Sequence, residues 1–104
     1  MKNKNEVSSF DKDTLERIRK DRKFAAVFFE DLSERPMAVQ LSVLRRIRGA
    51  SQESMASKLR RNQNYISKLE KPGSDHLLSN YEKAAKILHG RIAIIPEGSK
   101  IMPA

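Results

Sequence analysis

Residues 51–71, SQESMASKLRRNQNYISKLEK, predict two short helices joined by a sharp turn. Ser51 and Asn62 each carry a side-chain oxygen that suits the start of a helix. Only a few residues around Arg60 and Arg61 separate the two helices, so the pair must pack at a steep angle. Apolar residues follow each cap at helical spacing, namely Met55, Ala56 and Leu59 in the first helix and Ile66 and Leu69 in the second. The spacing predicts a helix-turn-helix.

The second of these helices carries amide side chains away from its apolar side. Gln63 and Asn64 stand in its first turn. An amide can pair with both the N6 donor and the N7 acceptor of adenine in the major groove, which a lone charge cannot do selectively. The pattern therefore indicates DNA recognition. The alternative is that both amides are simply solvated residues on a surface helix.

Composition and charge favour a small, basic, nucleic-acid-binding domain. The chain has 104 residues, of which 38% are hydrophobic, so it can form one domain with a modest core that dimerisation or a partner would help. The net charge is +8. Residues 1–36 carry nine Lys or Arg against eight Asp or Glu, whereas residues 37–90 carry ten against four. This excess around the helix pair suits phosphate neutralisation, although a merely soluble basic surface is the alternative.

Other functional classes find little support in the sequence. There is no cysteine, hence no disulfide and no thiolate zinc site, and a reducing cytoplasm fits this composition. The first ten residues are polar and no long apolar run follows, so we expect neither a secretory signal nor a membrane span. His76 and His89 have no carboxylate or thiol partner at metal-ligand spacing. We therefore expect no enzyme, no catalytic residue, no metal and no cofactor.

The N-terminal third divides into a tail and a helical arm. Residues 1–9 are polar and predicted to be disordered, and residues 10–36 form the arm. Asp13 or Thr14 is expected to cap a first helix, and Asp21 a second one that carries all but one of the four phenylalanines. The arm either packs on its own domain as a further helical layer or docks a partner protein as a helix in a groove. The candidate contact residues are Leu15, Ile18, Phe24 and Phe28.

Residues 37–90 form the predicted DNA-binding domain, and residues 91–104 form a strand and a tail. A helix is expected over residues 37–48, ended by Gly49, and another over residues 78–88, ended near Gly90. Residues 91–95, RIAII, are β-branched and stop at Pro96, which predicts a strand. A solitary strand has exposed edges, so it should pair with its own copy or with another protein. The candidate dimerisation residues are Ile92, Ile94 and Ile95.

Residues 41–90 resemble the Xre group of helix-turn-helix domains, the fold of the lambda-type repressors. The segment LSVLRRIRGASQESMASKL matches L-x-x-L-R-x-x-x-G-x-S-Q-E-x-x-A-x-x-L and runs without a gap into NQNYISKLE, which matches N-Q-x-x-I-S-x-L-E. With the arm segment KDRKFAAVFF and the strand GRIAIIP, the arrangement also resembles the HigA-type antitoxins. Members of that family neutralise a RelE-fold ribonuclease toxin such as HigB and repress their own operon.

The resemblance implies an all-α, lambda-repressor-like bundle with an N-terminal helical arm and one short C-terminal β-strand. The amide-bearing helix, the charge excess and the arm together lead to the hypothesis of a homodimeric repressor on palindromic double-stranded operator DNA that also acts as the antitoxin of its operon. Arg45 and Glu70 match an internal ion pair of the family, and Arg60 stands where many members have Gly. Gln52 would meet a phosphate and support Gln63. The expected DNA contacts are Gln63, Asn64 and Lys68 at base edges, with Asn62 and Arg61 near the backbone.

Two rival interpretations remain at this stage. One is a stand-alone Xre-family regulator whose arm only completes the fold. The other is a basic RNA-associated adaptor without sequence readout, which would bind weakly and with strong salt dependence.

Overall fold

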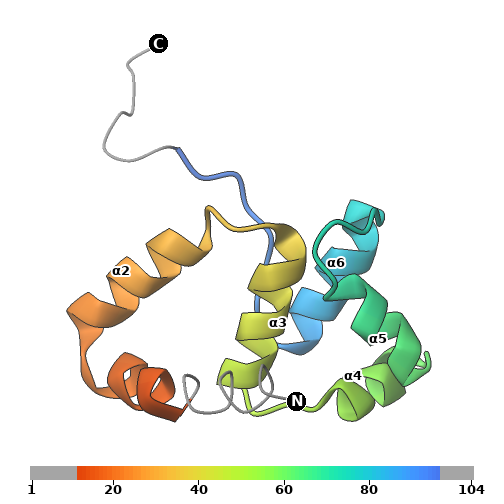
Figure 1. Ribbon diagram of the computed structural model, residues 1–104, viewed down its shortest axis with the longest axis horizontal. Helices are drawn as coiled ribbons and strands as arrows, with labels where there is room; N and C mark the ends of the chain where they lie inside the picture. The colour runs from red at the N-terminus through yellow and green to blue at the C-terminus, as the bar shows by residue number, and fades with distance from the viewer. Residues whose placement is uncertain (1–11, 97–104) are drawn as a thin grey trace.

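Every regular element in residues 12–96, the part of the chain that the computed structural model describes, is a helix (Figure 1). The expected all-α class is thus confirmed for this part of the chain. The predictions for the tail of residues 1–9, for Phe10 and for the tail from Glu97 lie outside it. The helices are residues 12–20, α2 (Arg22–Leu32), α3 (Met37–Ile47), α4 (Gln52–Leu59), α5 (Gln63–Leu69) and α6 (Leu78–Ile87).

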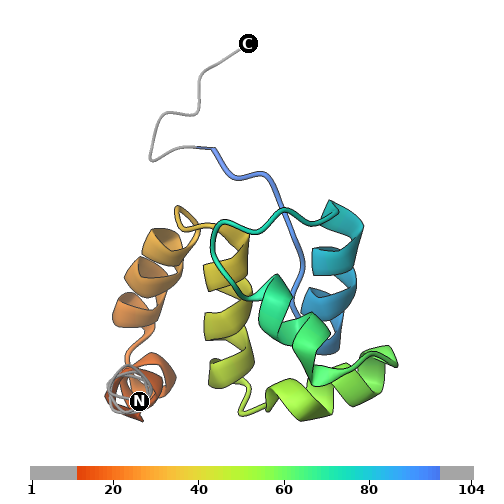
Figure 2. The ribbon, with the colours of Figure 1, turned by 45° about the vertical axis from the view of Figure 1, so that its right-hand side comes forward.

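One hydrophobic core joins the last four helices. α4 packs against α5 and α6, and α3 packs against α6 (Figure 2). Met55, Ile66 and Leu69 have no exposed surface, which confirms the prediction that they belong to the core. Their neighbours in the buried cluster are Leu41, Ala56, Tyr81, Ala84 and Leu88. α5 is therefore fixed to the rest of the bundle by its apolar side.

The predicted caps of α4 and α5 are present. The Ser51 hydroxyl accepts a hydrogen bond from the Ser54 N–H at 3.0 Å, and Asn62 Oδ1 accepts one from the Tyr65 N–H at 2.9 Å. Between the helices Arg60 has a φ of 58°, in the left-handed region, where a non-glycine residue costs roughly 1–2 kcal/mol. The turn is nevertheless closed, because the Arg61 N–H donates to the Ala56 carbonyl at 2.8 Å.

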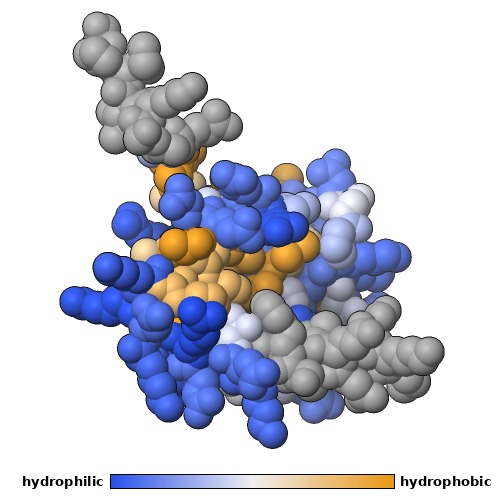
Figure 3. Space-filling model, turned by 60° about the vertical axis from the view of Figure 1, so that its left-hand side comes forward, coloured by the Kyte–Doolittle hydropathy of each residue, from blue (hydrophilic) through white to orange (hydrophobic). Residues whose placement is uncertain are grey.

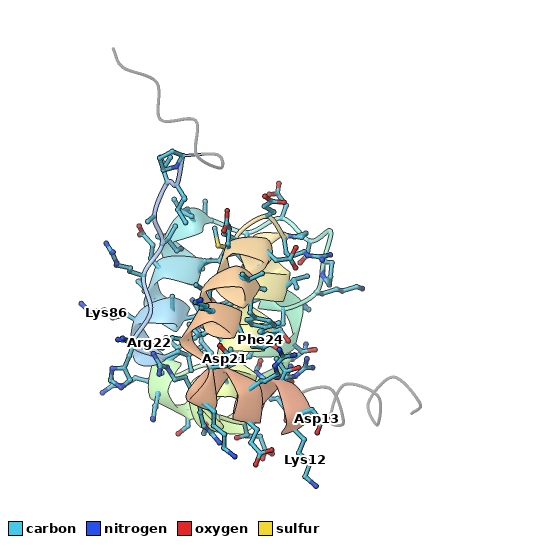
Figure 4. All side chains as sticks on the ribbon, turned by 90° about the vertical axis from the view of Figure 1, so that its left-hand side faces the viewer. Lys12, Asp13, Asp21, Arg22, Phe24 and Lys86 are labelled. Carbon is cyan, nitrogen blue, oxygen red and sulfur yellow. The ribbon has the colours of Figure 1, made fainter. Side chains whose placement is uncertain are left out.

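The arm is held much less firmly than the bundle. α2 has no buried residue. Asp21 caps it as predicted, accepting from the Phe24 N–H at 3.0 Å, at the junction with the preceding helix (Figure 4). The Arg17 guanidinium lies 4.3 Å from the centre of the Phe24 ring, and the Gln40 amide of α3 donates to the Arg35 carbonyl at 2.8 Å. Of these contacts only the hydrogen bond between Gln40 and Arg35 joins the arm to α3, since Arg17, Asp21 and Phe24 all belong to the arm.

Two expectations for local structure differ from what is observed. Residue 12 is already helical, so neither Asp13 nor Thr14 caps the first helix. Residues 91–96 contain no strand, because a strand requires backbone partners on a neighbouring segment and the described chain offers none there. Ile92 is half-buried, while Ile94 is fully exposed and Ile95 largely so. None of the helices within residues 12–96 has the length and apolar character needed to cross a bilayer.

The core predicts a large effect of truncating Ile66. Ile66→Ala should lower the free energy of unfolding by about 2–5 kcal/mol, because it leaves a cavity at a site without exposed surface. Ser67→Ala, at an exposed position of the same helix, should change it by less than about 0.5 kcal/mol. Urea unfolding of both variants measures the difference. Equal effects would contradict the assigned core.

Candidate nucleic-acid interface

The six residues predicted to contact DNA lie on α4, α5 and the turn between them. Gln52 begins α4 and is half-buried. Gln63, the first residue of α5, is exposed, and its Nε2 donates to Gln52 Oε1 at 3.3 Å. Asn64 and Lys68 are four positions apart on α5, so they share one exposed face of that helix. The structure therefore brings the amides and Lys68 to one helix.

A buried ion pair lies directly behind these amides. Arg45 Nε donates to Glu70 Oε2 at 2.6 Å and Arg45 Nη2 donates to Glu70 Oε1 at 3.0 Å. Only 11% of the Arg45 side chain and 5% of the Glu70 side chain are exposed. Arg45 Nη1 also donates to the Ala50 carbonyl at 2.9 Å, and Gln52 Nε2 donates to Glu70 Oε1 at 3.0 Å. The ion pair implied by the family resemblance is present.

Basic side chains surround the turn. The Arg61 guanidinium lies 4.4 Å from the centre of the Tyr65 ring, a cation–π contact that orients an exposed charge. Asn62 Oδ1 already accepts the hydrogen bond that caps α5. The amide nitrogen of Asn62 remains available to donate to an acceptor such as a phosphate oxygen. The exposed cations of these two helices and their flanks are Lys58, Arg60, Arg61, Lys68 and Lys71.

The C-terminal end of α5 is held by donors from the segment that follows. The Tyr81 hydroxyl of α6 donates to the Leu69 carbonyl at 2.9 Å, and the Ser74 hydroxyl lies 2.8 Å from the Lys68 carbonyl. His76 Nε2 lies 3.1 Å from the same Lys68 oxygen. Together with the Asn62 cap at the N-terminal end, these contacts fix both ends of a short helix. Apart from the polar character of the loop, no sequence pattern indicates these contacts.

A separate apolar groove lies between α2, α3 and the segment after α6. Its volume is about 220 Å³. It does not include Leu15, Ile18, Phe24 or Phe28, which are half-buried elsewhere on the arm. It is lined instead by Phe29, Leu32, Met37, Leu44, Ile92 and Ile95, among others.

Two apolar side chains of α2 face solvent, and of the two only Phe29 lines the groove. Val27 is 66% exposed and Phe29 is 39% exposed. Figure 3 shows apolar side chains gathered on this face of the molecule and bordered by hydrophilic ones. The side of α2 that faces the groove could have been predicted from the sequence by helical spacing from Phe29. The part played by Ile92 and Ile95 could not, because it depends on the path of residues 91–96 in the folded chain.

No group of three or more His, Asp or Glu side chains within residues 12–96 is arranged to hold a metal ion. Comparison with protein-family models, curated proteins and solved structures finds no match to this chain. The assignment of a function therefore depends on the chemistry of the surfaces described above.

The buried hydroxyl beneath α5 predicts a pH dependence of stability. Burial raises the pKa of Tyr81 above its ordinary value of 10.0, and the charge of Asp75 adds to the rise. The unfolded chain therefore loses this proton first, so the contribution of Tyr81 is fully present below pH 10.0 and is lost as the pH rises through its folded-state pKa.

Urea unfolding between about pH 9 and about pH 11 tests this expectation. Tyr81→Phe should be less stable at the lower pH, by about 1–3 kcal/mol, because the Leu69 carbonyl loses its donor. Its stability should then fall less steeply with pH than that of the wild type. Identical slopes would show that Tyr81 does not carry the effect.

Proposed function

We propose that this protein is a dimeric repressor of the Xre helix-turn-helix type that also acts as the antitoxin of a type II toxin–antitoxin system in the cytoplasm. The observation that carries the DNA-binding part is the braced pair of amides. Gln63 is exposed on α5 and is supported through Gln52 by a buried ion pair. Exposed cations lie on both sides of it.

In this proposal α4 and α5 are the two helices of the motif, and α5 enters the major groove. Gln63 and Asn64 pair with base edges, and Lys68, on the same helix face as Asn64, approaches the bases as well. Arg61, Asn62 and the second N–H of Gln52 meet phosphates. Phosphate contacts supply affinity and position, while the amides supply the choice of sequence.

Two copies would bind a palindromic operator with their α5 helices about 34 Å apart, one turn of B-DNA. Residues 91–95 remain the proposed pairing segment, with Ile92, Ile94 and Ile95 at the contact. The exposure of Ile94 and Ile95 supports this, since such apolar surface favours a partner. The paired segments would then be the C-terminal strand expected from the sequence.

The proposed toxin-binding surface is the arm. α2 and α5 lie on opposite sides of α3 (Figure 1), so a RelE/HigB-like ribonuclease on the arm would leave α5 free for DNA. The exposed Val27 and Phe29 and the acidic Glu30 and Glu34 beside the groove suit a basic partner with an apolar contact face. The second candidate function is a stand-alone Xre-family regulator without a toxin.

Gln63 and Asn64 provide the test of DNA recognition. Replacing both by Ala should reduce the preference for the operator by about 1–3 kcal/mol for each bidentate contact, without loss of helical content. Competitive binding to operator and unrelated DNA measures this. Glu30→Ala, which also truncates an exposed side chain but on α2, should keep the preference. Weak, salt-sensitive binding indifferent to sequence would instead favour the RNA-associated adaptor.

Val27 provides the test of partner docking. Val27→Glu places a charge on the exposed surface of α2. It should lower the affinity for the protein encoded by the adjacent gene at least about tenfold, equivalent to roughly 1.4 kcal/mol, and so reduce co-purification with that protein. The Gln63→Ala, Asn64→Ala double variant should retain that partner. If the wild type retains no partner encoded beside its own gene, the stand-alone regulator is the better assignment.

A further inference from the structure

A chain of four polar side chains connects the buried ion pair to the exposed surface of α5. It runs from Arg45 to Glu70, then to Gln52 and finally to Gln63, with successive distances of 2.6, 3.0 and 3.3 Å. The members come from α3, from the residue that ends α5, from α4 and from the start of α5. A buried charge is thereby linked to a side chain that faces solvent.

The direction of every hydrogen bond in this chain follows from the charge at its buried end. A carboxylate only accepts hydrogen bonds, and both oxygens of Glu70 accept from Arg45. The part of the Gln52 amide that meets Glu70 must therefore be its nitrogen. Gln52 Oε1 is then turned toward Gln63, where it can only accept.

The same reasoning fixes the amide of Gln63. Its nitrogen must face Gln52 Oε1, so one N–H is engaged inside the protein. The second N–H and the oxygen remain for a ligand. One donor beside one acceptor complements the major-groove edge of adenine, whereas guanine offers two acceptors, N7 and O6.

We propose that Glu70 is a positioning residue for base readout, which sets the orientation of the Gln63 amide through Gln52 and so excludes guanine at the position that Gln63 contacts. This proposal rests on the proposed DNA-binding function. Glu70 touches no base itself. The effect of Glu70 requires its negative charge, because an amide of the same shape can both donate and accept and so does not fix which side chain donates in each hydrogen bond.

Glu70→Gln preserves the shape of the side chain at position 70 but no longer fixes which partner donates in each hydrogen bond. Gln52 can then turn and donate to Gln63 Oε1, which leaves both N–H groups of Gln63 free. Two donors match the two acceptors of guanine. The variant should therefore lose its discrimination between adenine and guanine while it still binds DNA.

The experiment begins with selection of preferred sites from random duplex DNA by the wild-type protein. The position read by Gln63 is the one at which Gln63→Ala loses preference. The affinity ratio for adenine over guanine there should fall about tenfold or more in Glu70→Gln. Tyr81→Phe is the matched control, because it removes a hydrogen bond at the same end of α5, to the Leu69 carbonyl beside Glu70, but leaves all four polar side chains in place, so its ratio should stay at the wild-type value.

A second variant keeps the ion pair intact. Gln52→Met retains side-chain length but interrupts the chain, so it should lose discrimination to the same degree. Glu70→Gln should add no further loss of discrimination in that background, although it should still lower the melting temperature. An unchanged ratio in Glu70→Gln or in Gln52→Met, or additive losses in the double variant, would overturn the proposal. If the wild type selects no sequence at all, the proposed function fails and this proposal fails with it.

Discussion

The orientation of α5 depends on the buried ion pair between Arg45 and Glu70. Arg45 binds both oxygens of Glu70 and also the carbonyl of Ala50, so one guanidinium joins α3, the loop before α4 and the end of α5. Gln52 adds α4 to the same group. A buried charge whose partner is missing costs about 3–5 kcal/mol, a large fraction of the stability of a domain this small. The pair therefore constrains the site as well as the fold.

The features that could be predicted from the sequence act over short distances or through burial. Ser51, Asn62 and Asp21 cap their helices because a cap needs only a side-chain oxygen three residues before a backbone N–H. Met55 and Ile66 are buried because helical spacing places them on the inner side.

What the sequence could not supply depends on contacts between distant segments or with other molecules. The contact between Gln52 and Gln63 was expected from a family resemblance and not from their spacing, and its geometry depends on the carboxylate of Glu70, 18 positions after Gln52. The strand expected at residues 91–95 needs a backbone neighbour, and residues 12–96 supply none. The groove beside α2 likewise involves Ile92 and Ile95, far along the chain from the arm.

The weak attachment of α2 bears on how the protein is removed from a cell. A helix without buried residues opens at a lower free energy than the bundle, so a protease would reach the arm while α3 to α6 are still folded. If the toxin binds the arm as proposed, cleavage there would release the ribonuclease while the remaining fragment could still occupy the operator. Under the proposed function, the poor packing of one helix would set the order in which the two activities are lost during proteolysis.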